Sequence, residues 1–382
     1  MRRAILALAF LLAIALPCRA QAKPNTLTPK EIADGWILLF DGETTFGWIG
    51  KGLKADGGAL HFGDVGAALS SVQFASFEFR GEYQCDTDKT LLGVKGATPG
   101  VESFHGQFLP MQREWTPVRI LVENQRIVID VPGTEPETKS PFAWTDPCVI
   151  RINQGNDTKT KLRNIKLRPL NAKSLFNGKD LTGWKTFPGE KYKSKFAVVD
   201  NAINVKDGPG DLQTVGKYQD FILQLECISN GKHLNSGIFF RCRDNEYQNG
   251  YESQISNEFK AEPQKYLDEE YDPMTNKLVG KKEVVSNAFD FGTGAIYRRV
   301  PARKQMSKDG EWFGMTIVAH GNHLATWVNG VQVTDWTDNR PKSDNARTGC
   351  KLEAGHISIQ GHDPTTDLSF KNFRIAEFSP AK

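Results

Sequence analysis

The sequence predicts an all-β protein built from two tandem antiparallel β-sandwiches. Three observations indicate this fold. Apolar residues alternate with polar ones at a period of two, Asn-Gly turn signals recur between these stretches, and three blocks of sequence occur twice in the same order. No stretch shows the period and end signals of a long amphipathic helix. With 39% apolar and 24% charged residues, the 382-residue chain can bury one or two cores.

The chain begins with a segment typical of a secretory signal. Arg2 and Arg3 precede an apolar run at residues 4–17 that is too short to span a bilayer, and Ala20-Gln21-Ala22 offers a small-x-small cleavage pattern. We expect residues 1–22 to be removed near Ala22, leaving a periplasmic or secreted protein without an integral membrane segment. The mature chain would carry 45 basic and 45 acidic side chains. This neutrality argues against a nucleic-acid partner.

Internal repeats divide the remaining chain into two units. LFDGETTFGW at residues 39–48 resembles LFNGKDLTGW at 175–184, residues 114–133 resemble 311–330, and LRNIKL at 162–167 resembles FKNFRI at 370–375. We therefore expect a first sandwich over residues 23–170 and a second over residues 171–382. The increasing offsets place an insertion in the second unit between about Arg241 and Gly310.

Alternation within the second unit separates an apolar core face from a polar face. A hairpin over residues 221–243 would place Cys227 opposite Cys242 and Arg241 on the same polar face as Glu226. The two cysteines could then form a cross-strand disulfide or remain as buried thiols. For Arg241, the ordinary structural role would be an ion pair with Glu226 or with Glu252.

Two more alternating segments add polar residues to this face. Residues 251–255 place Glu252 beside Gln254, and residues 356–362 place Gln360 beside His362. A face lined by Arg, Glu, Gln and His suits a hydroxyl-rich ligand, although a polar face is also the ordinary outer surface of a half-buried sheet. The first unit keeps framework residues but has no counterpart of the Tyr-Glu-x-Gln run. We therefore expect the second unit to hold the site and the first to be a degenerate copy.

Several motifs of the second unit occur together in one known family. They are SLFNGKDLTGW (174–184), NSGIFFR (235–241), GYESQI (250–255), GTGAIY (292–297), Glu-Trp (311–312) and GHISIQGHD through FKNFRI (355–375). Through them the chain resembles the 3-keto-disaccharide hydrolase family, whose members are also described as 3-keto-glucoside 1,2-lyases and 3-keto-2-hydroxyglucal hydratases. The resemblance covers roughly residues 173–378 and departs from the family pattern at Phe313, where Asn commonly follows Glu-Trp. It implies a concanavalin/laminin-G-like jelly-roll fold for each sandwich.

The resemblance also implies an exported enzyme that cleaves 3-keto glycosides by elimination and hydration. A ketone at sugar carbon 3 acidifies the hydrogen on carbon 2. A base can therefore remove that hydrogen, the enolate expels the aglycone from carbon 1, and water adds to the product. This route needs no oxocarbenium-type transition state.

The activity that the resemblance implies needs a base, an acid and a partner for the enolate oxygen, and residues of the polar face can supply them. We predict His362 as base or acid, Glu252 as the competing base and Arg241 as the partner of the enolate oxygen. The predicted sugar contacts are Gln254, Gln360, Asn235 and Tyr297. A histidine at the end of a strand can instead simply bond to its neighbour, here Asp363.

A metal requirement and a second function stay open. No cofactor is certain and a divalent cation is conceivable, but His362-Asp363 with Glu252 is a weak ligand set, and residues 266–272 read more readily as an exposed acidic loop than as a calcium site. The alternative function is that of a non-catalytic, lectin-like carbohydrate-binding protein, because a jelly roll does not by itself imply catalysis.

Overall fold

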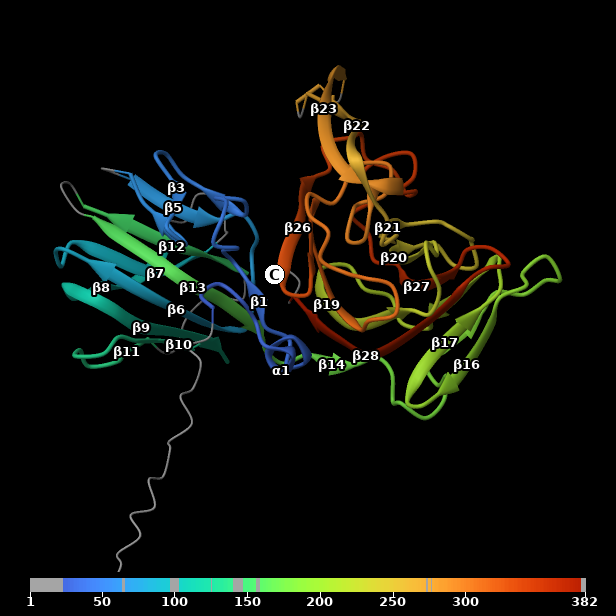
Figure 1. Cartoon of the computed structure of the whole chain (residues 1–382), viewed down its shortest axis with the longest axis horizontal. Coiled ribbons are helices and arrows are strands. Elements are labelled where there is room, and N and C mark those ends of the chain that lie inside the picture. The colour runs from blue at the N-terminus through green and yellow to red at the C-terminus, as the bar shows by residue number, and fades with distance from the viewer. Residues whose placement is uncertain are drawn as a thin grey trace, which may run out of the picture.

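The computed structural model describes residues 23–63, 66–96, 103–124, 126–139, 147–155, 159–272, 274–275 and 277–378. The all-β prediction is confirmed: apart from helix α1 (Pro29–Ala33) and the 3-10 turn η1 (Phe289–Phe291), the regular elements are strands. Figure 1 shows two sandwiches side by side. The expected signal at residues 1–22 lies outside the described residues, so export stays a prediction. In the described part of the chain, no helix has the length and hydropathy to cross a membrane.

The first half of the chain forms an eight-stranded and a five-stranded antiparallel sheet. The larger sheet has the order β11-β10-β9-β6-β13-β4-β3 with β1 paired to β13, and the smaller has the order β2-β5-β12-β7-β8. The strands are β1 (Ile37–Leu38), β2 (Trp48–Ile49), β3 (Lys54–Asp56), β4 (Ala59–His61), β5 (Gly66–Ser70), β6 (Phe77–Cys85), β7 (Thr90–Gly96), β8 (Phe104–Leu109), β9 (Gln112–Glu123), β10 (Arg126–Asp130), β11 (Glu137–Lys139), β12 (Cys148–Gln154) and β13 (Thr160–Pro169).

The second half repeats this architecture. Its larger sheet has the order β16-β17-β28-β19-β24-β25-β26 with β14 paired to β28, its smaller sheet has the order β15-β18-β27-β20-β21, and β22-β23 form a separate hairpin. The strands are β14 (Lys173–Ser174), β15 (Trp184–Thr186), β16 (Lys195–Val199), β17 (Ala202–Lys206), β18 (Gly210–Thr214), β19 (Phe221–Ser229), β20 (Ser236–Cys242), β21 (Tyr251–Ile255), β22 (Phe259–Tyr271), β23 (Leu278–Ala288), β24 (Phe313–His320), β25 (His323–Val328), β26 (Val331–Thr337), β27 (His356–Gly361) and β28 (Asp367–Glu377).

Small structural details recur in both sandwiches. The indole N–H of Trp48 donates to the carbonyl of Leu39 at 2.6 Å, and that of Trp184 donates to the carbonyl of Leu175 at 2.8 Å. One interior strand of each larger sheet carries a bulge at an asparagine with positive φ, Asn164 in β13 and Asn372 in β28. The repeated sequence blocks therefore occupy corresponding places in the two sandwiches.

The expected hairpin over residues 221–243 does not form. Strand β19 belongs to the larger sheet and β20 to the smaller one, so the chain crosses from one sheet to the other between them. Cys227 and Cys242 consequently do not face each other in one sheet, and both are buried free thiols. The expected alternative of a cross-strand disulfide is therefore wrong.

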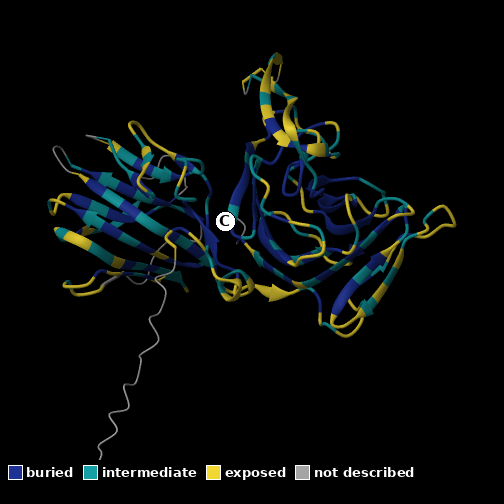
Figure 2. Cartoon of the chain, in the orientation of Figure 1, coloured by how far each residue is buried: buried dark blue, intermediate teal, exposed yellow. Residues whose placement is uncertain are grey.

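The two sandwiches share a buried contact. Trp327, in β25 of the second half, is 1% exposed and packs with the core residues of the first half, where its ring centre lies 6.5 Å from that of Phe74. Its indole N–H donates to the carbonyl of Leu38 at 2.9 Å, and an ion pair of 2.9 Å joins Arg303 to Asp41. Figure 2 shows buried residues continuing through this junction, whereas the β22-β23 hairpin is largely exposed.

We expect Trp327→Ala to destabilise the whole protein. The variant removes a large buried side chain from the junction, and such truncations cost about 3–5 kcal/mol. Trp312→Ala is the matched control, because Trp312 is 40% exposed. Thermal unfolding followed by circular dichroism should show a large fall in Tm for the first variant and a small change for the second. Equal shifts would contradict a structural role for the junction.

Candidate active site on the five-stranded sheet

The candidate site is the outer face of the five-stranded sheet in the second half. Apolar residues of this sheet, such as Leu212 and Ile359, point into the core. The alternate residues form two rows across the strands, Gln254–Gly237–Gln360–Asp211 and Glu252–Phe239–Ser358–Gln213. The sheet register thus brings side chains from β18, β20, β21 and β27 onto one polar face.

Loops cover this face and remove it from water. Residues 289–300 run along the free edge of β21, where the N–H of Tyr297 donates to the carbonyl of Glu252 at 3.0 Å and the N–H of Gln254 donates to the carbonyl of Ala295 at 3.1 Å. Although they lie on an outer face, Glu252 is only 4% exposed and Asp211 only 2%. Buried carboxyl groups are costly unless they are paired or protonated.

Glu252 is paired with an arginine. An Nη of Arg347 donates to a carboxylate oxygen of Glu252 at 3.1 Å. The carboxylate lies directly over Gly237, where an added Cβ would be 2.6 Å from a carboxylate oxygen, so any other residue here would displace the carboxylate. Burial raises the pKa of Glu252 to about 7, despite the opposing charge of Arg347.

Asp211 is a second buried carboxyl group that the sequence analysis missed. One of its oxygens accepts a long hydrogen bond of 3.4 Å from the N–H of Gln248, and the other has no hydrogen-bond partner among the described residues. Burial raises the pKa of Asp211 to about 8, and the charge of Glu252 adds to the increase. The sequence could have identified this residue, because Asp211 alternates with the core residue Leu212 and must therefore lie on the outer face of the strand.

Unsatisfied acceptors gather along one row of the face. Within the described residues, three oxygen atoms of this row are buried without a hydrogen-bond donor. They are one carboxylate oxygen of Asp211 and the side-chain carbonyl oxygens of Gln254 and Gln360. Buried polar atoms are normally hydrogen-bonded. Three such acceptors in a row suit a ligand that brings several hydroxyl groups.

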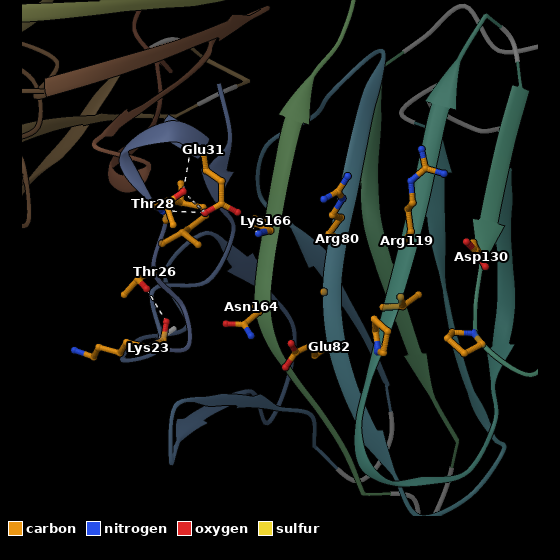
Figure 3. A pocket seen from close by; sticks show the side chains of 16 residues that line it. Lys23, Thr26, Thr28, Glu31, Arg80, Glu82, Arg119, Asp130, Asn164 and Lys166 are labelled. Carbon is orange, nitrogen blue, oxygen red and sulfur yellow. Dashed lines mark hydrogen bonds and ion pairs between the residues drawn. The ribbon is translucent and has the colours of Figure 1, made fainter. Parts of the chain in front are cut away.

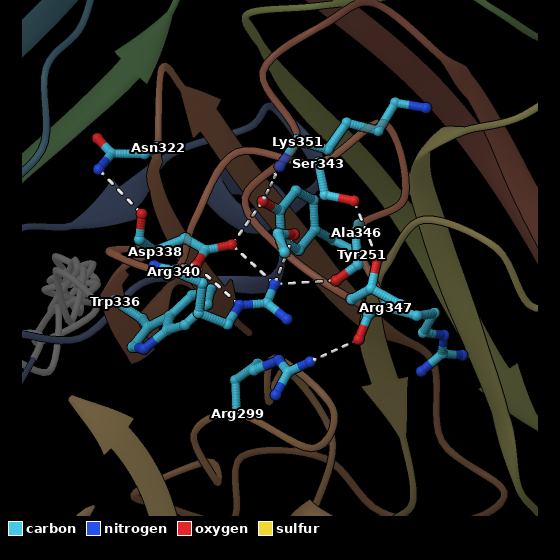
Figure 4. Close-up of polar contacts among 12 residues, drawn as sticks. Tyr251, Arg299, Asn322, Trp336, Asp338, Arg340, Ser343, Ala346, Arg347 and Lys351 are labelled. Carbon is cyan, nitrogen blue, oxygen red and sulfur yellow. Dashed lines mark hydrogen bonds and ion pairs between the residues drawn. The ribbon is translucent and has the colours of Figure 1, made fainter. Parts of the chain in front are cut away.

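The loop that carries Arg347 is held by a buried ion pair. The guanidinium of Arg340 donates to both carboxylate oxygens of Asp338 at 2.9 and 2.8 Å and to the carbonyls of Ala346 and Gly349 (Figure 4). The hydroxyl of Tyr251 donates to Asp338 at 2.7 Å. Tyr251, next to Glu252 in the chain, therefore fastens the Arg347 loop from the core side of β21.

The structure brings five of the seven predicted site residues together. Glu252, Gln254 and Gln360 lie in the two rows. The side-chain amides of Asn235 and Gln254 both donate to one carboxylate oxygen of Asp290, at 2.7 and 2.9 Å, and the ring of Tyr297 lies 5.9 Å from the guanidinium of Arg347. Asp290 lies in the 3-10 turn η1 and Arg347 in a loop, outside the alternating strands, so the sequence offered no signal for either.

Arg241 lies outside this cluster. A bulge between Phe239 and Cys242 gives Arg241 a positive φ of 52° and breaks the alternation on which its placement was based. Its guanidinium is 0% exposed and is bonded to three backbone carbonyls and to Asp220. The guanidinium of Arg241 is thus engaged by groups of the protein, and its ion-pair partner is neither of the two glutamates that were considered.

His362 lies at the rim of the face. It follows the last residue of β27, is partly exposed, and its ring Nδ1 lies 2.9 Å from a carboxylate oxygen of Asp363. This is the local bond that the sequence analysis gave as its alternative. A role for His362 in proton transfer stays a prediction.

The two metal-ligand sets considered from the sequence are not assembled among the described residues. Residues 266–272, read as an exposed acidic loop, instead lie largely in strand β22. In the part of the chain that the structure describes, no three His, Cys, Asp or Glu side chains are grouped so as to hold an ion.

A separate hollow of about 600 Å³ lies in the first half, between the segment around α1 and the outer face of the larger sheet (Figure 3). Its charged side chains are largely paired: Lys166 with Glu31, and Arg80 and Arg119 with Glu78. These pairs already satisfy the groups that would recognise a polar ligand. The buried, unsatisfied groups on the five-stranded sheet make that sheet the stronger candidate.

Comparison with known proteins points to the same half of the chain. Residues 171–376 match the family described as the 3-keto-alpha-glucoside-1,2-lyase-like domain. A 3-keto-disaccharide hydrolase of Bacteroides thetaiotaomicron is 25% identical over 232 residues, which cover 53% of this chain and 77% of that protein. A Parabacteroides distasonis structure, provisionally assigned as a glycosyl hydrolase, has 23% identity and a TM-score of 0.40 and covers 54% of this chain and 93% of its own. The carbohydrate-binding module CBM66 of Bacillus subtilis has 13% identity and a TM-score of 0.32, covering 50% and 93%.

We expect Asp211→Asn to change how stability depends on pH. An aspartate in an unfolded chain has a pKa of about 4, whereas that of Asp211 in the folded protein is about 8. The folded state therefore binds more protons between these values, and its stability falls as pH rises through them. The Tm of the variant should exceed that of the parent at pH 8, and the difference should shrink towards about pH 4.

Asp344→Asn is the control for this comparison, because Asp344 has an 81% exposed side chain. Thermal unfolding of the three proteins across this pH range gives the test. A difference between Asp211→Asn and the parent that stays constant with pH would contradict the elevated pKa.

Proposed function

Since the chain belongs to the 3-keto-alpha-glucoside-1,2-lyase-like family, we propose that the five-stranded sheet of its second half cleaves 3-keto glycosides by elimination and hydration. The observation that carries this proposal is the pair of buried carboxyl groups, Asp211 and Glu252, in different surroundings on one polar face. An elimination needs a base and an acid at once, and unequal surroundings let two like groups take these two roles.

Glu252 is the proposed base. Arg347 favours its ionised form and aligns its carboxylate. Glu252 takes the proton from carbon 2 of the sugar, and the electron pair of that C–H bond moves into an enolate whose charge rests on the carbon 3 oxygen. Arg347, which takes the role expected of Arg241, stabilises that oxygen with its guanidinium.

Asp211 is the proposed acid. Among the residues that the structure describes, no cation lies within hydrogen-bond distance of it, and burial keeps its proton on at neutral pH. When the enolate reforms the ketone, a double bond forms between carbons 1 and 2 and the bond from carbon 1 to the leaving oxygen breaks. Asp211 gives its proton to that oxygen. Water then adds across the double bond, so the overall result is hydrolysis.

The unsatisfied acceptors support a sugar as the ligand. Gln254 and Gln360 present carbonyl oxygens that fit the hydroxyl groups of the ring, and Asn235 and Tyr297 flank the same row. The same features fit a lectin-like protein that binds sugars without cleaving them. The two functions differ in whether carbon 2 loses its hydrogen.

A deuterium experiment separates these functions. The purified protein is incubated in D₂O with methyl and disaccharide 3-keto-glucosides, and the products are followed by mass spectrometry. We expect release of the leaving group, a transient unsaturated keto sugar and one deuterium at carbon 2 of the hydrated product. Binding without release or exchange would favour the lectin-like function, and release without deuterium at carbon 2 would contradict the elimination.

We expect Glu252→Gln to lose turnover while it still binds the sugar. Removal of a general base costs roughly 10²- to 10⁴-fold in rate, whereas the amide keeps the shape of the side chain. Glu226→Gln is the matched control, because Glu226 lies in the larger sheet, where it is bonded to Asn372. Single-turnover rates and binding by calorimetry give the test. Full turnover by Glu252→Gln would transfer the role of base to another residue, and His362→Ala would then be the next variant.

A further inference from the structure

We propose that Asp290 is a positioning residue, which turns the side-chain amide of Gln254 so that its carbonyl oxygen faces the sugar. The inference rests on the proposed function and adds a rule of specificity: the ring must keep a free hydroxyl group where Gln254 meets it, and the ketone is excluded from that place. Three observations carry it, namely the hydrogen bonds that two amides make to Asp290, the burial of the Gln254 oxygen, and the backbone of the turn that holds Asp290.

Asp290 accepts hydrogen bonds from two side-chain amides of the site. The amide nitrogens of Asn235 and Gln254 donate to the same carboxylate oxygen, at 2.7 and 2.9 Å. The nitrogen of Gln254 also donates to the backbone carbonyl of Asp290 at 3.1 Å. A carboxylate and a carbonyl can only accept, so both N–H groups of Gln254 must point at Asp290. The reversed amide would place acceptors against each other.

The other end of the Gln254 amide is available to a ligand. With its nitrogen held at Asp290, its carbonyl oxygen is buried and has no hydrogen-bond donor among the described residues. A buried acceptor without a donor is unfavourable until a ligand supplies one. Gln254, which is 1% exposed in β21, therefore presents a hydroxyl acceptor in a fixed direction rather than an amide that can turn either way.

The turn that holds Asp290 has a strained backbone. Asp290 has a φ of 46° and Phe291 a φ of 68°, so two successive residues other than glycine occupy the left-handed region. The N–H of Ala302 donates to the carbonyl of Phe291 at 2.8 Å and helps to hold this conformation. Strained residues concentrate at functional sites, where the surrounding structure maintains them. Here the turn directs both the side chain and the carbonyl of Asp290 towards Gln254.

The direction of the Gln254 amide limits where the ketone of the substrate can lie. A ketone oxygen can only accept, so the Gln254 oxygen repels it, whereas the guanidinium of Arg347 can only donate and suits it. In the proposed mechanism, carbon 2 faces Glu252 and carbon 3 faces Arg347. The ring hydroxyl groups that remain for Gln254 are those on carbons 4 and 6. Asp290 thereby helps to select one orientation of the 3-keto sugar.

The test uses sugars in which fluorine replaces one hydroxyl group, because a C–F group cannot donate a hydrogen bond. The full-length protein is assayed with methyl 3-keto-glucoside and with its 4-fluoro and 6-fluoro analogues. We expect kcat/KM to fall by about 10- to 100-fold for at least one analogue, since that sugar leaves a buried acceptor unpaired. In Gln254→Ala this selectivity should disappear, because the acceptor is gone.

Two substitutions of Asp290 separate positioning from a merely structural role. In Asp290→Ala the amide of Gln254 can turn its nitrogen towards the fluorine, so selectivity against the same analogue should fall several-fold. Asp290→Asn should keep the selectivity, because two donors converge on one oxygen and the amide oxygen can take its place. A structural role alone would lower kcat/KM equally on all three sugars. Circular dichroism and Tm verify that each variant is folded.

Asp309→Ala is the matched control. Asp309 is likewise partly buried and accepts from a side-chain amide, that of Asn257, at 2.9 Å, but neither residue lies in the two rows of the polar face. We expect this variant to keep the selectivity of the native protein.

The results that overturn the inference differ from those that overturn the proposed function. Equal kcat/KM of the native protein on all three sugars, or full selectivity in Asp290→Ala, would remove the role of Asp290 and leave the cleavage intact. If the native protein cleaves none of the sugars, the proposed function is wrong. Calorimetry with the same sugars, on the native protein and Asp290→Ala, then decides the direction of Gln254: the expected selectivity in affinity supports it, and equal affinities overturn it.

Discussion

The burial of Asp211 and Glu252 under the loops of the second half is the constraint on which the candidate site depends. Two carboxyl groups withdrawn from water are unfavourable for folding unless cations, donors or protons compensate for the lost hydration. Arg347 compensates at Glu252, and protonation compensates at Asp211. In the proposed mechanism, these different surroundings let one group act as the base and the other as the acid on a single face.

The position of Arg347 in turn depends on groups that never face the ligand. The Asp338–Arg340 pair is itself buried, and its bonds to the backbone at Ala346 and Gly349 bracket Arg347. Tyr251 links that pair to β21, and Gly237 leaves the space into which the Glu252 carboxylate fits. The GYESQI and NSGIFFR motifs therefore combine residues of the site with residues that shape it.

Alternation was sufficient to place Glu252, Gln254 and Gln360 on one face, because side chains in a strand have a strict period of two. It could not show which sheet a strand joins, so the crossing between β19 and β20 was taken for a hairpin. It also failed at Arg241, where one extra residue in a bulge reverses the direction of the side chain. Asp290 and Arg347 lie outside the alternating strands and carry no periodic signal, and their positions depend on tertiary contacts alone.

The first half has the same strand order as the second half but lacks the carboxyl groups of the candidate site at the corresponding sheet positions. The sheet positions of Asp211, Glu252 and Gln254 correspond to Ala67, Gly106 and Phe108. A sandwich without carboxyl groups at these positions can still contribute by supporting its neighbour.

The contacts between the two halves show how that support reaches the site. Arg303 and Lys304 both pair with Asp41 of the first half, and they follow directly on the segment 289–300 that lines β21. In the middle of that segment, the carbonyl of Gly294 accepts from the hydroxyl of Thr334 at 2.9 Å, in the strand next to Trp327. The segment that carries Asp290 and Tyr297 is thus fastened at its centre to the second sandwich and beyond its end to the first. The first half thereby helps to fix one wall of the candidate site.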